Sequence, residues 1–288
     1  MKVLVTGATG RLGPLVCKEL LQRGHDVLGT DQRFAPGLTF PVKLADLRDW
    51  RAVYPLLEGR EAVVHLGNIS NLRVGPSPQV VLGDNVSMNG NVFRAAVDLG
   101  VRRIAFASSV QAMIRLEEGR PFDAPPRIPY FPLDGDAPAD PGHNFYGLSK
   151  EFGERTLRIL SDLEPRLACT SLRFPMLANH SFRERLQRPL PPSAVNFGEG
   201  LTYLDFGDAA ALVALVVERQ QPGYHQYFPA QALTLDGHTV ESTLTHFFPN
   251  TPLRRPKPEI DGLVDGSALA RDFGFRPRPP LTVRLERP

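Results

Sequence analysis

The pair of residues with the clearest capacity for chemistry in this 288-residue chain is Tyr146 and Lys150, four positions apart. On an α-helix that spacing places both side chains on one face, about one turn apart. A nearby ammonium favours the phenolate, so we expect the pKa of Tyr146 to fall from about 10 toward the operating pH, as a general base requires. The alternative is an exposed Tyr and Lys on an ordinary helix.

A helical pattern that starts at Asn144 and runs to about Leu163 carries this pair. Its apolar positions recur at three and four residues and predict one buried face, made by Phe145, Leu148, Phe152, Ile159, Leu160 and Leu163. Upstream, a predicted strand from Arg103 to Ala107 ends in Ser108-Ser109. Paired serines can simply cap a loop. With Tyr146 and Lys150 downstream, one hydroxyl is also well placed to bond a substrate oxygen.

The chain opens with a short apolar strand, Lys2 to Val5, then a glycine turn and a helical pattern from Pro14 to about Arg23. Gly7 allows a tight turn, Gly10 allows the backbone to approach a pyrophosphate, and Gly13 allows close packing of helix on strand. The turn therefore predicts a dinucleotide site, whose expected contacts here are Gly7, Thr9, Gly10, Arg11, Leu12 and Gly13.

Asp31 ends the second predicted strand, His25 to Thr30. A carboxylate about twenty residues past the glycines can accept both ribose hydroxyls and would repel a 2′-phosphate, which favours NAD over NADP. Arg11 and Arg33 keep NADP open as an alternative, because either could pair with that phosphate.

Asp46 and Leu47 follow a third predicted strand, Val42 to Leu44. They could meet the adenine ring of a dinucleotide. Asp46 could equally be the N-cap of the helical stretch Asp49 to Leu57.

The predicted strand from Glu61 to Leu66 is apolar throughout, as a parallel sheet covered on both faces requires. Small residues after such a strand leave room for a cofactor, and the expected contacts are Leu66, Gly67 and Asn68. His65 alone is more typical of a core histidine than of a catalyst. Asn85, inside the helical pattern from Gln79 to Leu99, either bonds a strand backbone or lies beside the cofactor.

In this order the motifs resemble those of the extended short-chain dehydrogenase/reductases, also called the NAD-dependent epimerase/dehydratase family. Further matches are Leu172-Arg173-Phe174, Asp208-Ala209-Ala210 and a closing pattern at Gly274 to Pro277. The resemblance implies that Tyr146 is the acid/base, that Lys150 holds the nicotinamide ribose, and that Ser109 binds the reacting oxygen. It also implies cofactor contacts by Ser108 and Phe174.

The fold implied by the resemblance is α/β, a doubly wound parallel (Rossmann) sheet with a small discontinuous lobe. Residues 1–173 and 206–230 would form the NAD-binding domain, and residues 174–205 and 231–288 the substrate lobe. The proline-rich stretch Pro121 to Pro141 resembles the loop that crosses above the active site in this family.

The substrate is expected to be smaller than a nucleotide sugar, because the segment between Arg173 and Asp205 is short for the family. His65 to Ser70, Phe106 to Ser109 and Tyr146 to Lys150 are similar to segments of uronate dehydrogenases. By that resemblance Ser70 and Arg173 contact a sugar acid, although Arg173 can also be a structural arginine at a strand end. Val110-Gln111 also lines the substrate region, where the family's dehydratases carry an acidic pair.

Composition narrows the function further. The formal net charge of +2 with dispersed basic residues gives no support to nucleic-acid or anionic-membrane binding. Cys17 and Cys169 both lie in apolar patterns and predict buried free thiols in a cytoplasmic protein, without a metal site. No run is long enough to cross a membrane.

We therefore predict an NAD-dependent oxidoreductase that acts on a sugar or sugar-acid carbinol. The alternatives are an NAD-dependent nucleotide-sugar epimerase, with no net redox, and a catalytically silent NAD(P)-binding sensor. The family resemblance implies a homodimer.

Overall fold

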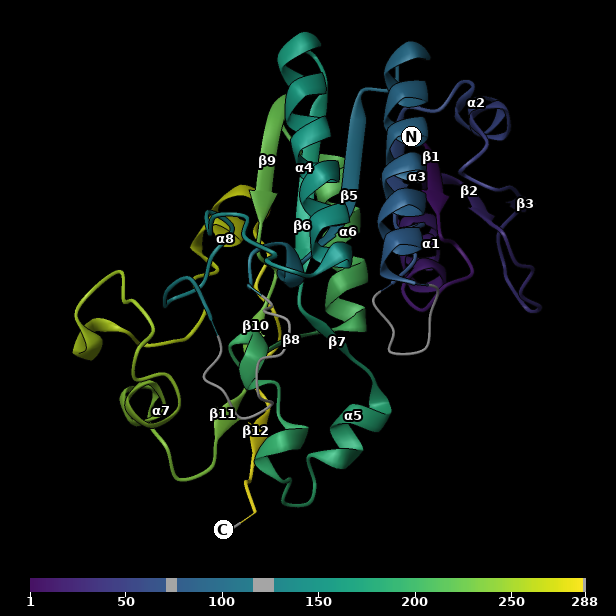
Figure 1. Ribbon diagram of the computed structural model, residues 1–288. Helices are drawn as coiled ribbons and strands as arrows, with labels where there is room; N and C mark the ends of the chain where they lie inside the picture. The colour runs from purple at the N-terminus through teal and green to yellow at the C-terminus, as the bar shows by residue number, and fades with distance from the viewer. Residues whose placement is uncertain (71–76, 116–126, 287–288) are drawn as a thin grey trace.

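A parallel sheet of seven strands, in the order β3-β2-β1-β4-β5-β6-β9, forms the centre of the computed structural model, which describes residues 1–70, 77–115 and 127–286 (Figure 1). Its strands are β1 (Lys2–Thr6), β2 (Asp26–Asp31), β3 (Val42–Leu44), β4 (Ala62–His65), β5 (Arg103–Ser109), β6 (Ala168–Phe174) and β9 (Gly223–Tyr227). The strand order reverses between β1 and β4, which in such sheets is where ligands bind. The predicted doubly wound fold is confirmed.

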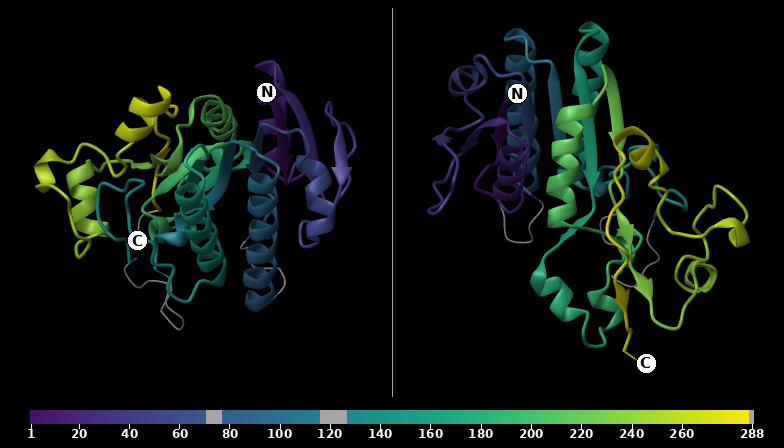
Figure 2. Two further views of the ribbon diagram at one scale, coloured as in Figure 1. Left: turned by 90° about the horizontal axis from the view of Figure 1, so that it is seen from above. Right: turned by 180° about the vertical axis from the view of Figure 1, so that it is seen from behind.

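Helices cover both faces of this sheet (Figure 2). They are α1 (Gly13–Gln22) and α6 (Phe206–Arg219) on one face, and α2 (Trp50–Leu57), α3 (Pro78–Asp98) and α4 (Phe145–Leu163) on the other. The alternation along β1 shows why: Val3 and Val5 pack with α1 and α6, whereas Leu4 packs with α2 and α3. Apolar side chains on both faces of a strand demand a layer of helices on each side.

The buried face of α4 differs from the prediction. Phe152, Ile159 and Leu163 are 41%, 52% and 69% exposed, whereas the buried face holds small and polar residues such as Gly153. A Cβ on Gly153 would lie 2.7 Å from the ring of Phe106, so close contact between α4 and β5 requires a residue without a side chain. Of the predicted apolar face, Phe152, Ile159 and Leu163 therefore face outward, whereas Leu160 is partly buried against the core.

A second core lies beyond the carboxyl ends of the sheet strands, below the sheet in Figure 1. It is built on β7 (Met176–Ala178), β8 (Thr202–Asp205) and β10 (Gln231–Ala232), and on the pair β11 (Thr234–Leu235) and β12 (Thr282–Val283). Its helices are α5 (His180–Arg185) and α7 (Val240–Phe247), with the short 3-10 turns η1 (Val110–Ala112), η2 (Pro192–Ala194), η3 (Phe197–Glu199) and η4 (Lys257–Glu259).

The final helix, α8 (Ser267–Phe273), returns to the main sheet. Leu269 and Phe273 belong to the same core as α1 and α6, and Arg219 donates to the carbonyl of Phe273. The division of the chain into two lobes remains a prediction, and α8, assigned to the substrate lobe, packs on the sheet domain. Cys17 and Cys169 are buried free thiols. None of the described helices has both the length and the apolar character that a membrane span needs.

Candidate active site

A cavity of about 650 Å³ opens at the carboxyl ends of the central strands, between the sheet and the second core. Residues from both parts line it. From the sheet domain and from the turn η1 that follows β5 come Arg11, Leu12, Leu66, Asn68, Ser70, Ser108, Ser109, Val110, Gln111, Tyr146, Lys150 and Phe174. From the second core come Met176, Leu177, Asn179, Ser181, Phe182, Arg185, Asn196 and Glu199.

Tyr146 and Ser109 both line this cavity, and the Ser109 hydroxyl acts to lower the pKa of the Tyr146 phenol. Ser109 ends β5, and its hydroxyl accepts from the amide of Gln111 at 3.2 Å. Asn144 caps α4 by accepting from the Gly147 amide at 3.0 Å, and its side-chain amide donates to Gln111 Oε1 at 2.8 Å. The start of the tyrosine helix is therefore tied to the turn that follows the serine.

Lys150 is buried and its ammonium is oriented by two acceptors. Nζ donates to Asn68 Oδ1 at 2.7 Å and to the carbonyl of Ala107 at 2.8 Å, and it lies 5.4 Å from the Tyr146 ring centroid. An ammonium has three donors, so a third remains for a ligand of the cavity. Asn68 lies where the sequence predicts a cofactor contact, and its direct partner in this structure is Lys150.

A buried polar chain supports Asn68. Its Nδ2 donates to Asn89 Oδ1 at 2.9 Å, and His65 Nε2 lies 2.9 Å from the same oxygen. His65 Nδ1 bonds the hydroxyl of Thr6 at 2.7 Å. Burial lowers the pKa of His65 to about 3, so this histidine is neutral, as expected of a core residue.

The acid/base groups do not titrate as the sequence suggests. Burial raises the pKa of Tyr146 to about 12, a shift that the Ser109 hydroxyl opposes and the charge of Glu199 reinforces. Burial also lowers the pKa of Lys150 to about 7, against the charge of Glu154. The predicted fall in the pKa of Tyr146 is therefore not seen in the protein alone, because the cost of burying a phenolate dominates.

The glycine turn has the form that a dinucleotide needs. Gly7 has φ +67°, and a Cβ there would lie 2.9 Å from the Gly67 amide. A Cβ on Gly13 would lie 2.2 Å from the Gly7 carbonyl, so only glycine lets α1 approach the turn. Leu12, the N-cap of α1, makes no side-chain capping bond, and the Leu15 amide already donates to the Leu12 carbonyl, so the Gly13 amide is left at this helix terminus for a phosphate.

Asp31 ends β2 beside this turn. Its carboxylate accepts from the Thr9 amide at 3.1 Å and from the Gln32 amide at 2.8 Å. The exposed Arg11 and Arg33 lie in the same region, and Arg11 stacks over the Phe206 ring at 5.3 Å. The turn, the helix terminus and Asp31 together fit a dinucleotide.

Three predicted cofactor residues, of which Ser108 lines the cavity and Asp46 and Asn85 do not, have structural partners. Asp46 pairs with Arg48 at 2.6 Å, which lowers its pKa to about 2, and the N-cap of α2 is Asp49. Asn85 is fully buried and bonds both backbone groups of Ile69, as its structural interpretation predicts. The Ser108 hydroxyl donates to Glu154 at 2.6 Å.

Arg173 does not line the cavity. It is 2% exposed, and its Nε and Nη2 bond the two carboxylate oxygens of Glu154 at 2.9 and 2.7 Å. Its Nη1 donates to the carbonyls of Ala137 and Gly135, on the described part of the proline-rich stretch. Of that stretch, 121–126 lie outside the described residues. The geometry matches the structural interpretation of Arg173.

Sequence patterns did not indicate the polar residues of the second core that line the cavity: Asn179, Arg185, Asn196 and Glu199. Glu199 accepts from Gln111 at 3.1 Å and from Asn196 at 2.7 Å. The next two residues, Gly200 and Leu201, both have positive φ, and a left-handed leucine is uncommon. No motif marks this turn, because its residues meet the tyrosine only through the tertiary fold.

A doubly wound sheet with a glycine turn, and a Tyr/Lys helix opposite a serine at a strand end, define a dinucleotide-dependent enzyme of the short-chain dehydrogenase/reductase type. The comparison with family models agrees: residues 3–216 match the NAD dependent epimerase/dehydratase family, and the chain belongs to it.

Relatives within the family carry different activities. The chain is 32% identical over 157 residues to a uronate dehydrogenase of Pseudomonas syringae pv. tomato, covering 53% of this chain and 51% of that protein. It is 29% identical over 231 residues to the NAD-dependent glucose-6-phosphate dehydrogenase of Haloferax volcanii, covering 75% and 80%. The matches thus span about half the length of the uronate dehydrogenase.

A solved structure shows the same fold. The UDP-glucose-4-epimerase of Stenotrophomonas maltophila, with bound NAD, superposes with a TM-score of 0.68 over 97% of this chain and 94% of that one, at 20% identity.

Proposed function

We propose that this protein oxidises a carbinol of a free sugar or sugar acid, with NAD as the hydride acceptor. The observation that carries the proposal is the convergence of Ser109, Tyr146 and Lys150 on one cavity that also reaches the glycine turn at Arg11 and Leu12. A silent sensor would not need this polar set, and the presence of both Tyr146 and Lys150 favours an enzyme.

In the proposed reaction, Tyr146 takes the proton of the substrate hydroxyl while Ser109 bonds the same oxygen. The Ser109 hydroxyl opposes the rise in the pKa of Tyr146 that burial causes. Lys150, held by Asn68 and Ala107, would direct its third donor to the nicotinamide ribose. Bound NAD supplies the hydride acceptor and adds a positive charge beside the phenol, which favours phenolate.

NAD is proposed over NADP because Asp31 lies at the end of β2, where its carboxylate would accept ribose hydroxyls and repel a phosphate. A sugar with an acidic group is proposed because the matched relatives are named for a uronate and for glucose 6-phosphate.

We also propose a cytoplasmic homodimer. The exposed apolar side chains of α4, Phe152, Ile159 and Leu163, form an unusually apolar outer face for a water-facing helix. Sedimentation of wild type and of Phe152→Glu/Ile159→Glu tests this point: a dimer that becomes a monomer supports it, and a monomeric wild type contradicts it.

The experiment that tests the activity is absorbance of NADH while protein and NAD are offered glucuronate, galacturonate, glucose, glucose 6-phosphate and UDP-glucose. NADH that accumulates with a free sugar, sugar acid or sugar phosphate supports the dehydrogenase. Conversion of UDP-glucose to its epimer without NADH, seen by chromatography, would establish the epimerase instead.

A further inference from the structure

The cavity contains an unpaired cation that no motif predicts. Arg185 lines the cavity from α5, and within residues 1–70, 77–115 and 127–286 it has neither an ion pair nor a side-chain hydrogen bond. The other cations of the lining have assigned places: Lys150 is held by Asn68 and Ala107, and Arg11 lies on the glycine turn over Phe206. Arg185 is therefore the guanidinium left for the substrate.

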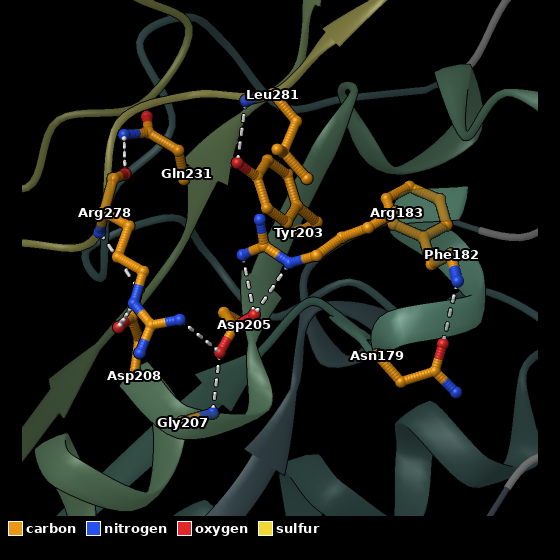
Figure 3. Close-up of polar contacts among 10 residues, drawn as sticks. All are labelled: Asn179, Phe182, Arg183, Tyr203, Asp205, Gly207, Asp208, Gln231, Arg278 and Leu281. Atoms are coloured by element: carbon orange, nitrogen blue, oxygen red, sulfur yellow. Dashed lines mark hydrogen bonds and ion pairs between the residues drawn. The ribbon is translucent and has the colours of Figure 1, made fainter. Parts of the chain in front are cut away.

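The short helix α5 is firmly anchored (Figure 3). Asn179 caps it by accepting from the Phe182 amide at 2.9 Å. Arg183 binds Asp205 with Nη2 at 2.7 Å and Nε at 3.2 Å. Asp205 also accepts from the Gly207 amide at the start of α6 and from Arg278, so α5 is tied to the sheet domain and to the C-terminal segment.

This anchor orients Arg185. Residues two apart on a helix point about 200° apart, so with Arg183 turned to Asp205 the side chain of Arg185 leaves from the opposite side. Ser181 and Phe182, four and three residues before Arg185, share its face, and both line the cavity. The helix thus presents one face to its anchor and the other to the cavity.

Glu199 contributes a negative charge to the cavity lining. Its carboxylate lies in the lining, bonded to Gln111, and its charge acts on Tyr146. The Glu199 carboxylate would repel an anionic group close to the reacting carbon. Neutral sugar hydroxyls, in contrast, could donate hydrogen bonds to it. Within the lining, an anion is therefore disfavoured beside Glu199 and favoured beside Arg185 of α5.

We propose that Arg185 binds the anionic group, a carboxylate or a phosphate ester, of the sugar on which Tyr146 acts, while Glu199 faces the hydroxyls near the reaction centre. The proposal rests on the proposed oxidation of a sugar. Arg185 replaces Arg173 as the proposed ligand of the substrate's carboxylate, because the Arg173 guanidinium is already bound by Glu154.

The test compares Arg185→Gln with Arg188→Gln, an exposed arginine on the same segment that does not line the cavity. The measured quantity is the ratio of kcat/KM for glucuronate to that for glucose, and likewise for glucose 6-phosphate to glucose. Loss of one charge-assisted bond should lower the affected ratio about tenfold to 100-fold in Arg185→Gln. Arg188→Gln should keep the wild-type ratios.

The two kcat/KM ratios distinguish a carboxylate site from a phosphate site. Only the ratio for the class of sugar that Arg185 binds should fall in Arg185→Gln. Ratios that stay unchanged in Arg185→Gln, or fall equally in Arg188→Gln, would overturn the assignment. Arg185→Lys should recover part of the lost ratio, since it restores the charge without the planar fork.

Failure of the proposed function is recognised separately. If wild type reduces no NAD with any sugar, saturation-transfer NMR of NAD-saturated protein with glucuronate, glucose 6-phosphate and glucose still reports binding. An anionic sugar that binds wild type and Arg188→Gln but not Arg185→Gln supports the site in a protein without this activity. Equal binding to all three proteins refutes the site.

Discussion

Replacement of Arg173 by methionine should destabilise the protein without altering substrate recognition. The side chain is 2% exposed and its partner Glu154 is 4% exposed, so the variant leaves a buried carboxylate whose remaining hydrogen bond, among the described residues, comes from Ser108. The carbonyls of Ala137 and Gly135 lose a donor as well.

The magnitude follows from this burial. Breaking a buried ion pair on one side costs about 3–5 kcal/mol, a large part of a total stability of about 5–15 kcal/mol. For a chain of this size, each kcal/mol lowers Tm by about 2–4 °C, so the expected loss is on the order of 10 °C. In Arg173→Met/Glu154→Leu no charge is left unpaired, and we expect most of the loss to be recovered.

Calorimetry of wild type, the single variant and the double variant measures these differences, and steady-state kinetics at a temperature where all are folded measures KM for a uronate. We expect the single variant's KM to stay within about twofold of wild type, since Arg173 does not reach the cavity. A variant with wild-type Tm and a KM raised about tenfold or more would show that Arg173 is a substrate ligand after all.

Three further variants probe the site. Tyr146→Phe should retain NAD binding by calorimetry and lose about 10²–10⁴-fold in kcat, and turnover close to wild type would exclude the acid/base role. Asp31→Ala should weaken NAD more than NADP, whereas an unchanged ratio of the two affinities would show that Asp31 does not hold the ribose. Glu199→Gln removes a charge that raises the pKa of Tyr146. The pH at which oxidation reaches half its maximum should therefore move to lower pH, and a shift to higher pH would contradict the arrangement.

The sequence was sufficient to predict the fold and the helix that carries Tyr146 and Lys150, because local signals carry both. The helix predicted to start at Asn144 and end near Leu163 is found at Phe145–Leu163, with Asn144 as its cap. The prediction of its buried face was wrong for Phe152, Ile159 and Leu163, which are exposed. Helical periodicity identifies an apolar stripe but not what the stripe meets, and the close approach of Gly153 to Phe106 is a property of the packed pair.

The roles of polar side chains were harder to predict for the same reason. Asp46 and Ser108 lie at strand ends, where a ligand contact is expected, yet Arg48 and Glu154 bind them. Neither Arg48 nor Glu154 belongs to a sequence motif that would mark it as a partner. An ion pair or a buried hydrogen bond is decided by which side chains the fold brings within about 3 Å of each other, and spacing along the chain does not reveal that.

The same contrast between local sequence signals and tertiary contacts applies to the residues that we propose for catalysis and for substrate specificity. The sheet domain, whose geometry is fixed by strand order and glycine turns, carries Tyr146, Lys150 and Ser109. Their motifs can therefore be recognised in the sequence. Glu199 and Arg185 come from a turn and a short helix of the second core. The first is oriented by a turn that ends in a left-handed Leu201, a conformation that costs about 1–2 kcal/mol, and the second by the Arg183–Asp205 pair. A strained backbone beside the Glu199 carboxylate is expected if recognition depends on the exact position of that carboxylate, as we propose. If the proposed oxidation of a sugar holds, exchange of these two elements should change which sugar is oxidised while the acid/base chemistry stays the same.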